Sequence, residues 1–362
     1  MMTRTGWRFG ARRPPPPTFA AIDLGTNNCR LVIATPHRRG FRVVDAYSRI
    51  VRLGEGVSKS GVLSEAAMAR TYDALKVCAE KMAGRNVYAS RCIATQACRS
   101  ASNGQAFLDR IRRDLGLRLE MVSAEEEAGL AVKGCQDLID PMAQAAMVFD
   151  IGGGSTEMSW LTVHADRDQR VRTELAAWMS IPMGVVTLAE YHGKREMSRA
   201  AFDAMTNVVA QQIRSLTVPD PVQTAFAEGA AHLVGTSGTV TSIAGIHLGL
   251  KRYVRREVDG LWLSQRNARI VGERLRSMRY ERRAEEPCVG PDRADLVVPG
   301  CAIFSGILKA WPVARIRVGD RGLREGLLID LMDEWQAQRS AARSECKHKR
   351  CTSNVNLHDS KG

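Results

Sequence analysis

The sequence has no apolar stretch that reaches the ~20 residues a transmembrane helix requires, and it has no pair of cysteines in CxxC spacing. It also lacks an apolar region after its first arginines, because the prolines Pro14 to Pro17 stand where a signal peptide would need one. These absences argue against a membrane partner, a secretory leader and a zinc site of the CxxC type. We expect residues 1–17 to form a disordered, basic and proline-rich leader.

The cysteines give no sign of a disulfide framework. Their number, nine, is odd, their spacing is irregular, and most of them lie in apolar runs. Cysteine in such a position behaves as a small hydrophobic residue. This usage predicts a reducing compartment, the cytoplasm.

The positive charge is concentrated at the two ends of the chain. The formal net charge is +13, of which residues 1–19, with no acidic residue, carry +4 and residues 336–362 carry another +4. A basic protein often binds polyanions, but charged tails are also readily solvated without a partner. We therefore expect residues 336–362 to be a flexible basic tail, and the milder charge of the rest suits a phosphate-rich substrate better than nucleic acid.

The alternation of predicted elements indicates an α/β protein. A helix is expected from Ser64, whose apolar positions follow one helical face, and strands and helices then alternate up to residue 137. The pattern restarts with a strand over residues 145–151, which ends in an aspartate and a glycine turn as residues 20–24 do. With 362 residues, two domains are expected, and the repeated opening predicts that they are related.

Three glycine-rich turns, each following an apolar strand, carry the chemistry expected of a phosphate site. Glycine lets backbone N–H groups approach an anion closely, and Ser and Thr hydroxyls add donors. Asp23 and Asp150 end the first two strands, where a carboxylate can hold Mg²⁺ directly or through water. The predicted phosphate-binding residues in these turns are Gly25, Thr26, Asn27, Gly152, Gly153, Gly154, Ser155, Thr156, Gly235, Thr236, Ser237 and Gly238.

The first two turns, Asp-Leu-Gly-Thr-Asn at 23–27 and Asp-Ile-Gly-Gly-Gly-Ser-Thr-Glu at 150–157, resemble the phosphate motifs of the exopolyphosphatase and guanosine pentaphosphate phosphatase (Ppx/GppA) family. Gly-Thr-Ser-Gly-Thr-Val-Thr at 235–241 resembles its third motif, and residues 293–295 and 320–326 are similar to further segments. Asn28 and Cys29 depart from the residues more usual beside the first motif.

The resemblance covers residues 19–335 and implies an actin-like ATPase (ribonuclease H-like) fold, with two similar domains closing on a cleft. Domain I is expected over residues 18–132, completed by a final helix over 322–335, and domain II over 133–321. It further implies a hydrolase that releases terminal phosphate, with Mg²⁺ or Mn²⁺ as cofactor. The substrate is left open between inorganic polyphosphate and guanosine pentaphosphate, and so is a homodimeric state.

One glutamate in the segment 123–128 is not explained by helix capping. Ser123 and Glu126 fit the Ser-x-x-Glu capping box, and Glu125 suits the positive end of the helix dipole. By resemblance, Glu127 matches the catalytic glutamate of the family, which orients or deprotonates the attacking water. A purely structural role for Glu127 is the alternative.

Further roles follow from the resemblance alone. Asp150 and Glu157 match positions near the metal, and their seven-residue spacing lets both carboxylates face one ion; Asp23 is added to this metal set only because it ends a strand as Asp150 does. Arg30 matches a phosphate-contacting residue, and Thr95 and Arg99 match a motif that faces the cleft. Simpler explanations are an exposed hairpin residue for Glu157, a surface strand for Arg30 and an ordinary helix start for Thr95 and Arg99.

Other classes of the same superfamily fit the sequence less well. A kinase needs an acceptor pocket with its own base, which we do not find, and a chaperone needs a substrate-binding domain after the ATPase. A non-catalytic sensor of polyphosphorylated nucleotides needs no base, and Glu127 therefore favours an enzyme.

Overall fold

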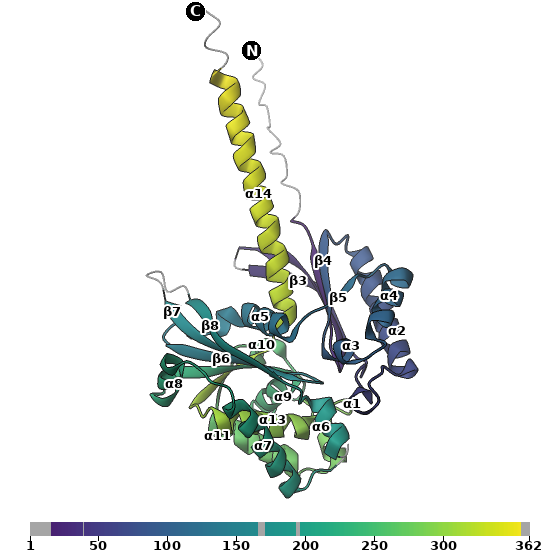
Figure 1. Ribbon diagram of the computed structural model, residues 1–362, viewed down its shortest axis with the longest axis vertical. Helices are drawn as coiled ribbons and strands as arrows, with labels where there is room; N and C mark the ends of the chain where they lie inside the picture. The colour runs from purple at the N-terminus through teal and green to yellow at the C-terminus, as the bar shows by residue number, and fades with distance from the viewer. Residues whose placement is uncertain (1–15, 39, 166–170, 193–195, 356–362) are drawn as a thin grey trace, which may run out of the picture.

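The computed structural model describes residues 16–38, 40–165, 171–192 and 196–355. The predicted leader up to residue 15 and the last seven residues of the predicted tail lie outside these ranges. Within them, no helix combines the length and the hydropathy needed to cross a bilayer. The chain forms two sheets flanked by helices, with a long C-terminal helix that starts between them and extends past the first sheet (Figure 1).

The first sheet has five strands in the order β3-β2-β1-β4-β5. Strands β1, β2 and β3 are antiparallel neighbours, whereas β4 and β5 run parallel to β1. Their bounds are β1 (Phe19–Leu24), β2 (Asn28–His37), β3 (Gly40–Ile50), β4 (Ala89–Ala94) and β5 (Leu119–Met121).

The second sheet repeats this plan. Its order is β8-β7-β6-β9-β11-β10, with β6, β7 and β8 antiparallel, β9 and β11 parallel to β6, and β10 added at the edge. The bounds are β6 (Ala145–Ile151), β7 (Thr156–Ala165), β8 (Val171–Ile181), β9 (Ala231–Thr236), β10 (Trp262–Ser264) and β11 (Arg315–Gly319). The expected α/β fold with two similar halves is confirmed.

The helices occupy both faces of each sheet. Ser64 caps α2 by accepting a hydrogen bond from the Ala67 N–H, as its position predicted. The first half contains α1 (Val57–Ser60), α2 (Glu65–Gly84), α3 (Gln96–Ser100), α4 (Gly104–Leu115) and α5 (Ala124–Cys135). The second half contains the 3₁₀ turn Gln136–Leu138, α6 (Val185–His192), α7 (Arg199–Arg214), α8 (Asp220–Ala227), α9 (Gly238–His247), α10 (Arg255–Val258), α11 (Gln265–Ser277), α12 (Tyr280–Glu285) and α13 (Val297–Ala310), followed by α14 (Leu323–Val355).

Strand alternation decides which way the two strand-end aspartates point. In β1, Ile22 is buried with the core under α2 and α4, whereas Ala21 is buried on the opposite face with α14. In β6, Phe149 belongs to the large core of the second half, and Val148 lies on the other face. Because side chains alternate between faces, Asp23 and Asp150 leave their strands on the faces that the two halves turn toward each other.

Helix α5 is fixed between the halves by close contact with α14. A Cβ atom at Gly134 would collide with the carbonyl oxygen of Gly322, and one at Gly326 would collide with that of Leu130. Glycine is therefore required for the two backbones to approach this closely. The packing sets the position of the first turn of α5, where Glu127 lies.

Helix α14 does not end near residue 335 but continues to Val355, so the residues 336–355 that we expected to be a flexible tail are helical. The start of α14 is held by the core of the first half through Leu323, Leu327, Leu328 and Met332. Extending an existing helix avoids the cost of nucleation, and residues 336–351 contain no Gly or Pro.

Candidate active site in the interdomain cleft

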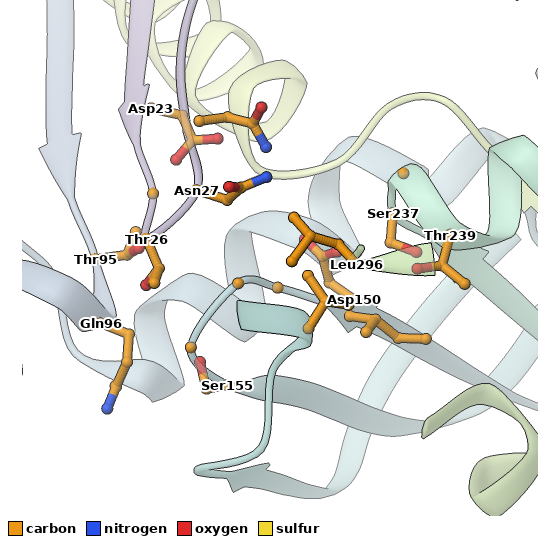
Figure 2. Close-up of a pocket in the computed structure, with 18 of the residues that line it drawn as sticks. Asp23, Thr26, Asn27, Thr95, Gln96, Asp150, Ser155, Ser237, Thr239 and Leu296 are labelled. Carbon is orange, nitrogen blue, oxygen red and sulfur yellow. The ribbon is translucent and has the colours of Figure 1, made fainter. Parts of the chain in front are cut away.

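A cavity lies between the two halves and collects most of the residues that the motifs predicted. It encloses about 910 Å³, including the space open to solvent. In Figure 2, Thr26 and Thr95 lie on one side, Ser237 and Thr239 on the other, and Asp150 lies between them. The predicted residues that line it are Asp23, Gly25, Thr26, Asn27, Arg30, Thr95, Glu127, Asp150, Gly152, Gly153, Gly154, Ser155, Ser237 and Gly238.

The first turn lines the cavity, and its carbonyl groups are bonded to the segment that follows β3. The Thr26 carbonyl accepts from the Gly54 N–H at 2.9 Å, and the Asn27 carbonyl accepts from the N–H groups of Val51 and Arg52 at 2.9 and 3.0 Å. The backbone N–H groups of Thr26 and Asn27 find no acceptor in the described part of the chain. The buried Asn27 Oδ1 atom also has no partner there. The turn therefore offers two donors and one acceptor to a ligand.

The second turn repeats the arrangement from the other half. The carbonyl groups of Gly152 and Gly153 accept from the N–H groups of Val185 and Val186 at 3.0 and 2.8 Å. Within the described ranges, the N–H groups of Gly153 and Gly154 have no protein acceptor. Successive free N–H groups of this kind form an anion-binding nest.

The two turns face each other at close range. A Cβ atom at Gly153 would lie 2.9 Å from Thr26 Cβ and 3.0 Å from the Asn27 nitrogen. A side chain at residue 153 would therefore displace the first turn. Glycine at this position lets both sets of donors reach the same ligand.

The third turn places strained backbone at the start of α9. Ser237 has φ 148° and ψ 163°, a region that is essentially restricted to glycine. Its side chain accepts a hydrogen bond from the Val240 N–H at 3.2 Å and so caps the helix. Gly238 and Thr239 follow in the cavity wall, where the positive end of the ten-residue helix favours an anion.

The strand-end carboxylates are paired in register with charged residues seven positions later. Asp23 lies opposite Arg30 on β2, and Asp150 lies opposite Glu157 on β7, so each pair shares one face of its sheet. Burial, reinforced by the like charge of Glu157, raises the pKa of Asp150 to about 7. Burial likewise raises the pKa of Asp23, against the opposing charge of Arg30.

These donors fit a hard divalent cation that is held together with a phosphate. In the described residues, no group of three or more His, Cys, Asp and Glu side chains could chelate a metal alone. Mg²⁺ commonly takes one or two carboxylates and completes its shell with water and phosphate oxygens. Asp23 and Asp150, together with the unpartnered Asn27 Oδ1 atom, supply such a set.

Glu127 lies in the cavity wall in the first turn of α5. Its Oε2 atom is 3.4 Å from Arg99 Nη1. Burial, followed by the charge of Glu157, raises the pKa of the Glu127 carboxyl well above its ordinary value. A buried carboxylate with a raised pKa in a cavity is typical of a general base.

The residues around Glu127 have structural partners of their own, with one difference from the predicted capping box. Ser123 Oγ accepts a hydrogen bond from the Glu126 N–H at 3.1 Å. The Glu126 carboxylate does not return to the cap but pairs with Arg91 on β4. Only Ser123 therefore caps the helix, because a stronger, charged partner is available to Glu126.

Two predicted cleft residues lie behind the cavity wall and hold other groups. Arg99 donates to the Val122 carbonyl at 2.6 Å and to Gln96 Oε1 at 2.8 Å, beside the Glu127 carboxylate. Glu157 is 4 % exposed and accepts from Ser180 Oγ at 2.9 Å. In this structure Arg99 therefore contacts the candidate base rather than the cavity, and Glu157 acts on the cavity through its charge.

Three predicted phosphate contacts are used inside the protein instead. Thr156 donates to the Met183 carbonyl at 2.7 Å, and Thr236 donates to the Phe149 carbonyl at 3.3 Å. Gly235 lies in β9, where a Cβ atom would be 2.5 Å from the ring of Phe149. The two threonine hydroxyls are thus bonded to backbone carbonyl groups, and Gly235 leaves room for the ring of Phe149. Thr236 also borders a second cavity.

This second cavity adjoins the first and shares Asp23, Arg30 and Asp150 with it. Sequence reasoning gave no role to its other charged residues, nor to Gln96 and Thr239 in the first cavity. For the charged residues the sequence did hold a signal, because they lie in the two further segments that resemble the family, residues 293–295 and 320–326. They are Arg293, Asp320, Arg321, Arg324 and Glu325.

Comparison with known proteins agrees with this geometry. The family model of the Ppx/GppA phosphatase family matches residues 32–335. A guanosine-5'-triphosphate,3'-diphosphate pyrophosphatase of Photobacterium profundum is 28% identical over 327 residues, which are 89% of this chain and 61% of that protein. The chain thus spans about three fifths of the length of the curated relatives it matches.

Solved structures show the same architecture. The Ppx/GppA family member of Aquifex aeolicus is 26% identical, with a TM-score of 0.71 over 88% of this chain and 99% of that one. An exopolyphosphatase-like protein is 29% identical, with a TM-score of 0.74 over 87% of this chain and 97% of that one. The fold, the two glycine turns that face each other and the family match lead to one conclusion: the chain belongs to the Ppx/GppA phosphatase family.

Proposed function

We propose that the protein is a phosphohydrolase that releases terminal orthophosphate from inorganic polyphosphate by in-line attack of water. The observation that carries this proposal is the convergence of two turns with unbonded N–H groups and of Glu127 on one cavity. Phosphoryl transfer requires mainly positioning and charge stabilisation, and these are the properties that the cavity offers.

The terminal phosphate would be bound between the two turns. The N–H groups of Thr26 and Asn27 approach it from one half, and those of Gly153 and Gly154 from the other. Arg30 adds a guanidinium group, which suits bidentate contact with phosphate oxygens. Asp23, Asp150 and Asn27 would hold Mg²⁺ or Mn²⁺, which supplies neutralising charge to the phosphate chain.

Glu127 would orient the attacking water and accept its proton at a carboxylate oxygen. Its raised pKa makes it a better proton acceptor than an ordinary glutamate once it is ionised. Arg99 limits the movement of the carboxylate by its contacts with Glu127, Gln96 and the Val122 carbonyl.

Guanosine pentaphosphate is the second candidate substrate. It is favoured by the relatives named guanosine-5'-triphosphate,3'-diphosphate pyrophosphatase, each 28% identical to this chain. Both substrates end in a phosphoanhydride, and the same turns and base would act on either. A non-catalytic sensor is the weaker alternative, since binding alone gives no use to a buried base.

The deciding experiment measures orthophosphate release by the purified protein from a short polyphosphate and from guanosine pentaphosphate, side by side. A higher kcat/KM for polyphosphate supports the first candidate, and a higher value for the nucleotide supports the second. Tight binding of either compound without phosphate release would overturn the enzymatic proposal in favour of the sensor.

We also propose a cytoplasmic location. Seven of the nine cysteines are buried and in no disulfide, which suits a reducing compartment. They are Cys29, Cys78, Cys92, Cys98, Cys135, Cys288 and Cys301. Fractionation of cells that express the full chain would test it.

A further inference from the structure

One segment of the first half, residues 51–58, is bonded to the second half at two separate places. Arg52 forms a bidentate ion pair with Asp295, with Nη1 2.8 Å from Oδ2 and Nη2 3.0 Å from Oδ1. Arg52 Nη2 also donates to the Asp292 carbonyl at 3.1 Å. The pair joins residues 243 positions apart in sequence.

The second place is Glu190 on α6. Its Oε1 atom accepts from the Gly56 N–H at 2.7 Å, and its Oε2 atom accepts from Ser58 Oγ at 2.8 Å. Both carboxylate oxygens of Glu190 are thus bonded to the first half. We refer to the two sets of bonds, around Arg52 and around Glu190, as the interdomain clasp.

The clasp segment also holds the first phosphate turn. The N–H groups of Arg52 and Gly54 bond the carbonyl groups of Asn27 and Thr26. A Cβ atom at Gly54 would collide with the Thr26 side chain. Any movement of residues 51–54 is therefore transmitted directly to the turn whose N–H groups face the cavity.

The partners of the clasp in the second half are joined to the opposite cavity wall. Asp295 is followed directly by Leu296, which lines the cavity. Glu190 belongs to α6, whose first residues Val185 and Val186 bond the carbonyl groups of Gly152 and Gly153. Each bond of the clasp therefore connects the first phosphate turn to an element that forms the facing wall.

The backbone of Arg52 supports a role for its side chain. Its φ of 49° lies in the left-handed region, which is uncommon for residues other than glycine, asparagine and aspartate. The Asp295 side chain is only 9% exposed, and the Arg52 side chain is 27% exposed. The ion pair is thus partly shielded from water. Bidentate charge-assisted hydrogen bonds are strong in such surroundings.

We propose that the interdomain clasp couples closure of the two halves to alignment of the phosphate turns, with Arg52 and Glu190 as positioning residues. With the clasp formed, Thr26 and Gly153 are held at their present close approach. Without it, the closed state is less populated, and the apparent affinity for a ligand of both turns falls in proportion. The expected change in affinity for the substrate rests on the proposed function. The expected change in closure of the two halves does not.

The test compares Arg52→Gln, Asp295→Asn, their double variant and Glu190→Gln with the wild-type full chain. The control is Arg199→Gln, which removes the ion pairs of Arg199 with Asp203 at 2.9 Å and with Glu273 at 3.2 Å, both within the second half. Because a hydrogen bond to a charged group contributes roughly a tenfold change in an equilibrium, we expect KM for short polyphosphate to rise about tenfold in Arg52→Gln. The value of kcat should change much less.

The double variant should be no worse than Arg52→Gln alone, because both substitutions break the same pair. Small-angle scattering of the ligand-free proteins should show a larger radius of gyration for Arg52→Gln and Glu190→Gln, and no change for Arg199→Gln. If Arg52→Gln fails to fold in a thermal melt, Glu190→Gln, which disturbs no ion pair among the described residues, carries the same two measurements.

Wild-type KM together with wild-type scattering in the clasp variants would overturn the proposal, as would additive effects in the double variant. If the wild-type protein releases no phosphate from any substrate, the proposed function fails. The scattering comparison then still decides whether the clasp holds the halves together.

Discussion

Replacement of Glu127 by glutamine tests the central role in the proposed mechanism. The substitution keeps the size of the side chain and removes its ability to accept a proton. We expect kcat to fall by roughly 10²–10⁴, the usual contribution of a positioned general base, which corresponds to about 3–5 kcal/mol of activation free energy. The fold should remain intact, because the Ser123 cap of α5 does not involve Glu127.

The structure also predicts the effect on stability and its sign. Burial and the charge of Glu157 raise the pKa of Glu127 in the folded protein above its value in the unfolded chain. A raised carboxyl pKa contributes stability at pH values below the unfolded pKa and loses it as the pH rises through the folded pKa. Glu127→Gln removes this loss, so the variant should melt at a higher temperature than the wild type, by a margin that grows from about pH 4.5 upward.

The assay is orthophosphate release from short polyphosphate and from guanosine pentaphosphate, with a thermal melt at each pH. The kcat of the wild type should rise with pH through the raised pKa of Glu127, and this limb should be absent in the variant. Glu126→Gln is the matched control, since Glu126 lies on the same turn, is 41% exposed and pairs with Arg91. Turnover in Glu127→Gln within about threefold of wild type, or an equal loss in Glu126→Gln, would refute the reasoning.

Three further predictions concern the metal, the turns and the ends of the chain. Activity should require Mg²⁺ or Mn²⁺, and Asp150→Asn should sharply raise the metal concentration needed, because a buried strand-end carboxylate is lost; full activity in excess chelator would contradict this. Gly153→Ala should lower kcat/KM at least tenfold, since its Cβ would lie 2.9 Å from Thr26 Cβ, whereas Gly129→Ala on α5, which meets nothing within 4 Å, should leave it unchanged. A protein spanning residues 18–336 should keep kcat on short polyphosphate, because it retains the contact of Trp335 with Phe19. Its KM for long polyphosphate should be higher than that of the full chain at low salt, because the basic ends are missing, and the difference should shrink as salt screens their attraction. A collapse of kcat on short polyphosphate would show that the removed residues belong to the site.

Local patterns in the sequence predicted most of the elements around the site. The apolar face after Ser64 gave α2, and the runs before Asp23 and Asp150 gave β1 and β6, each followed by its turn. These features could be predicted because capping and strand periodicity depend on neighbours in sequence. The family-like turns also identified the cavity wall, since glycine at a strand end lets the backbone approach a neighbouring group closely.

Sequence could not predict where the side chains of Arg99, Thr156 and Glu157 would be bonded. Each is of a type that binds phosphate or metal, yet their partners are Val122, Met183 and Ser180, which only tertiary packing brings near. The length of α14 was also missed, because a polar basic segment alone has no periodicity that distinguishes a helix from a flexible tail. The first turns of α14 pack on the core of the first half, and the rest of the helix extends from them.

The sequence by itself thus determined the plan of two similar halves, the glycine turns at the strand ends and the family, and it singled out Glu127 in the first turn of α5. Only the tertiary structure decided that the two turns meet face to face across Gly153 and Thr26, and that Arg52 reaches Asp295. Turns and caps are encoded by residues a few positions apart. The closure of a cleft depends on pairs separated by more than a hundred residues, whose distance is fixed by how both sheets pack around α5 and α14.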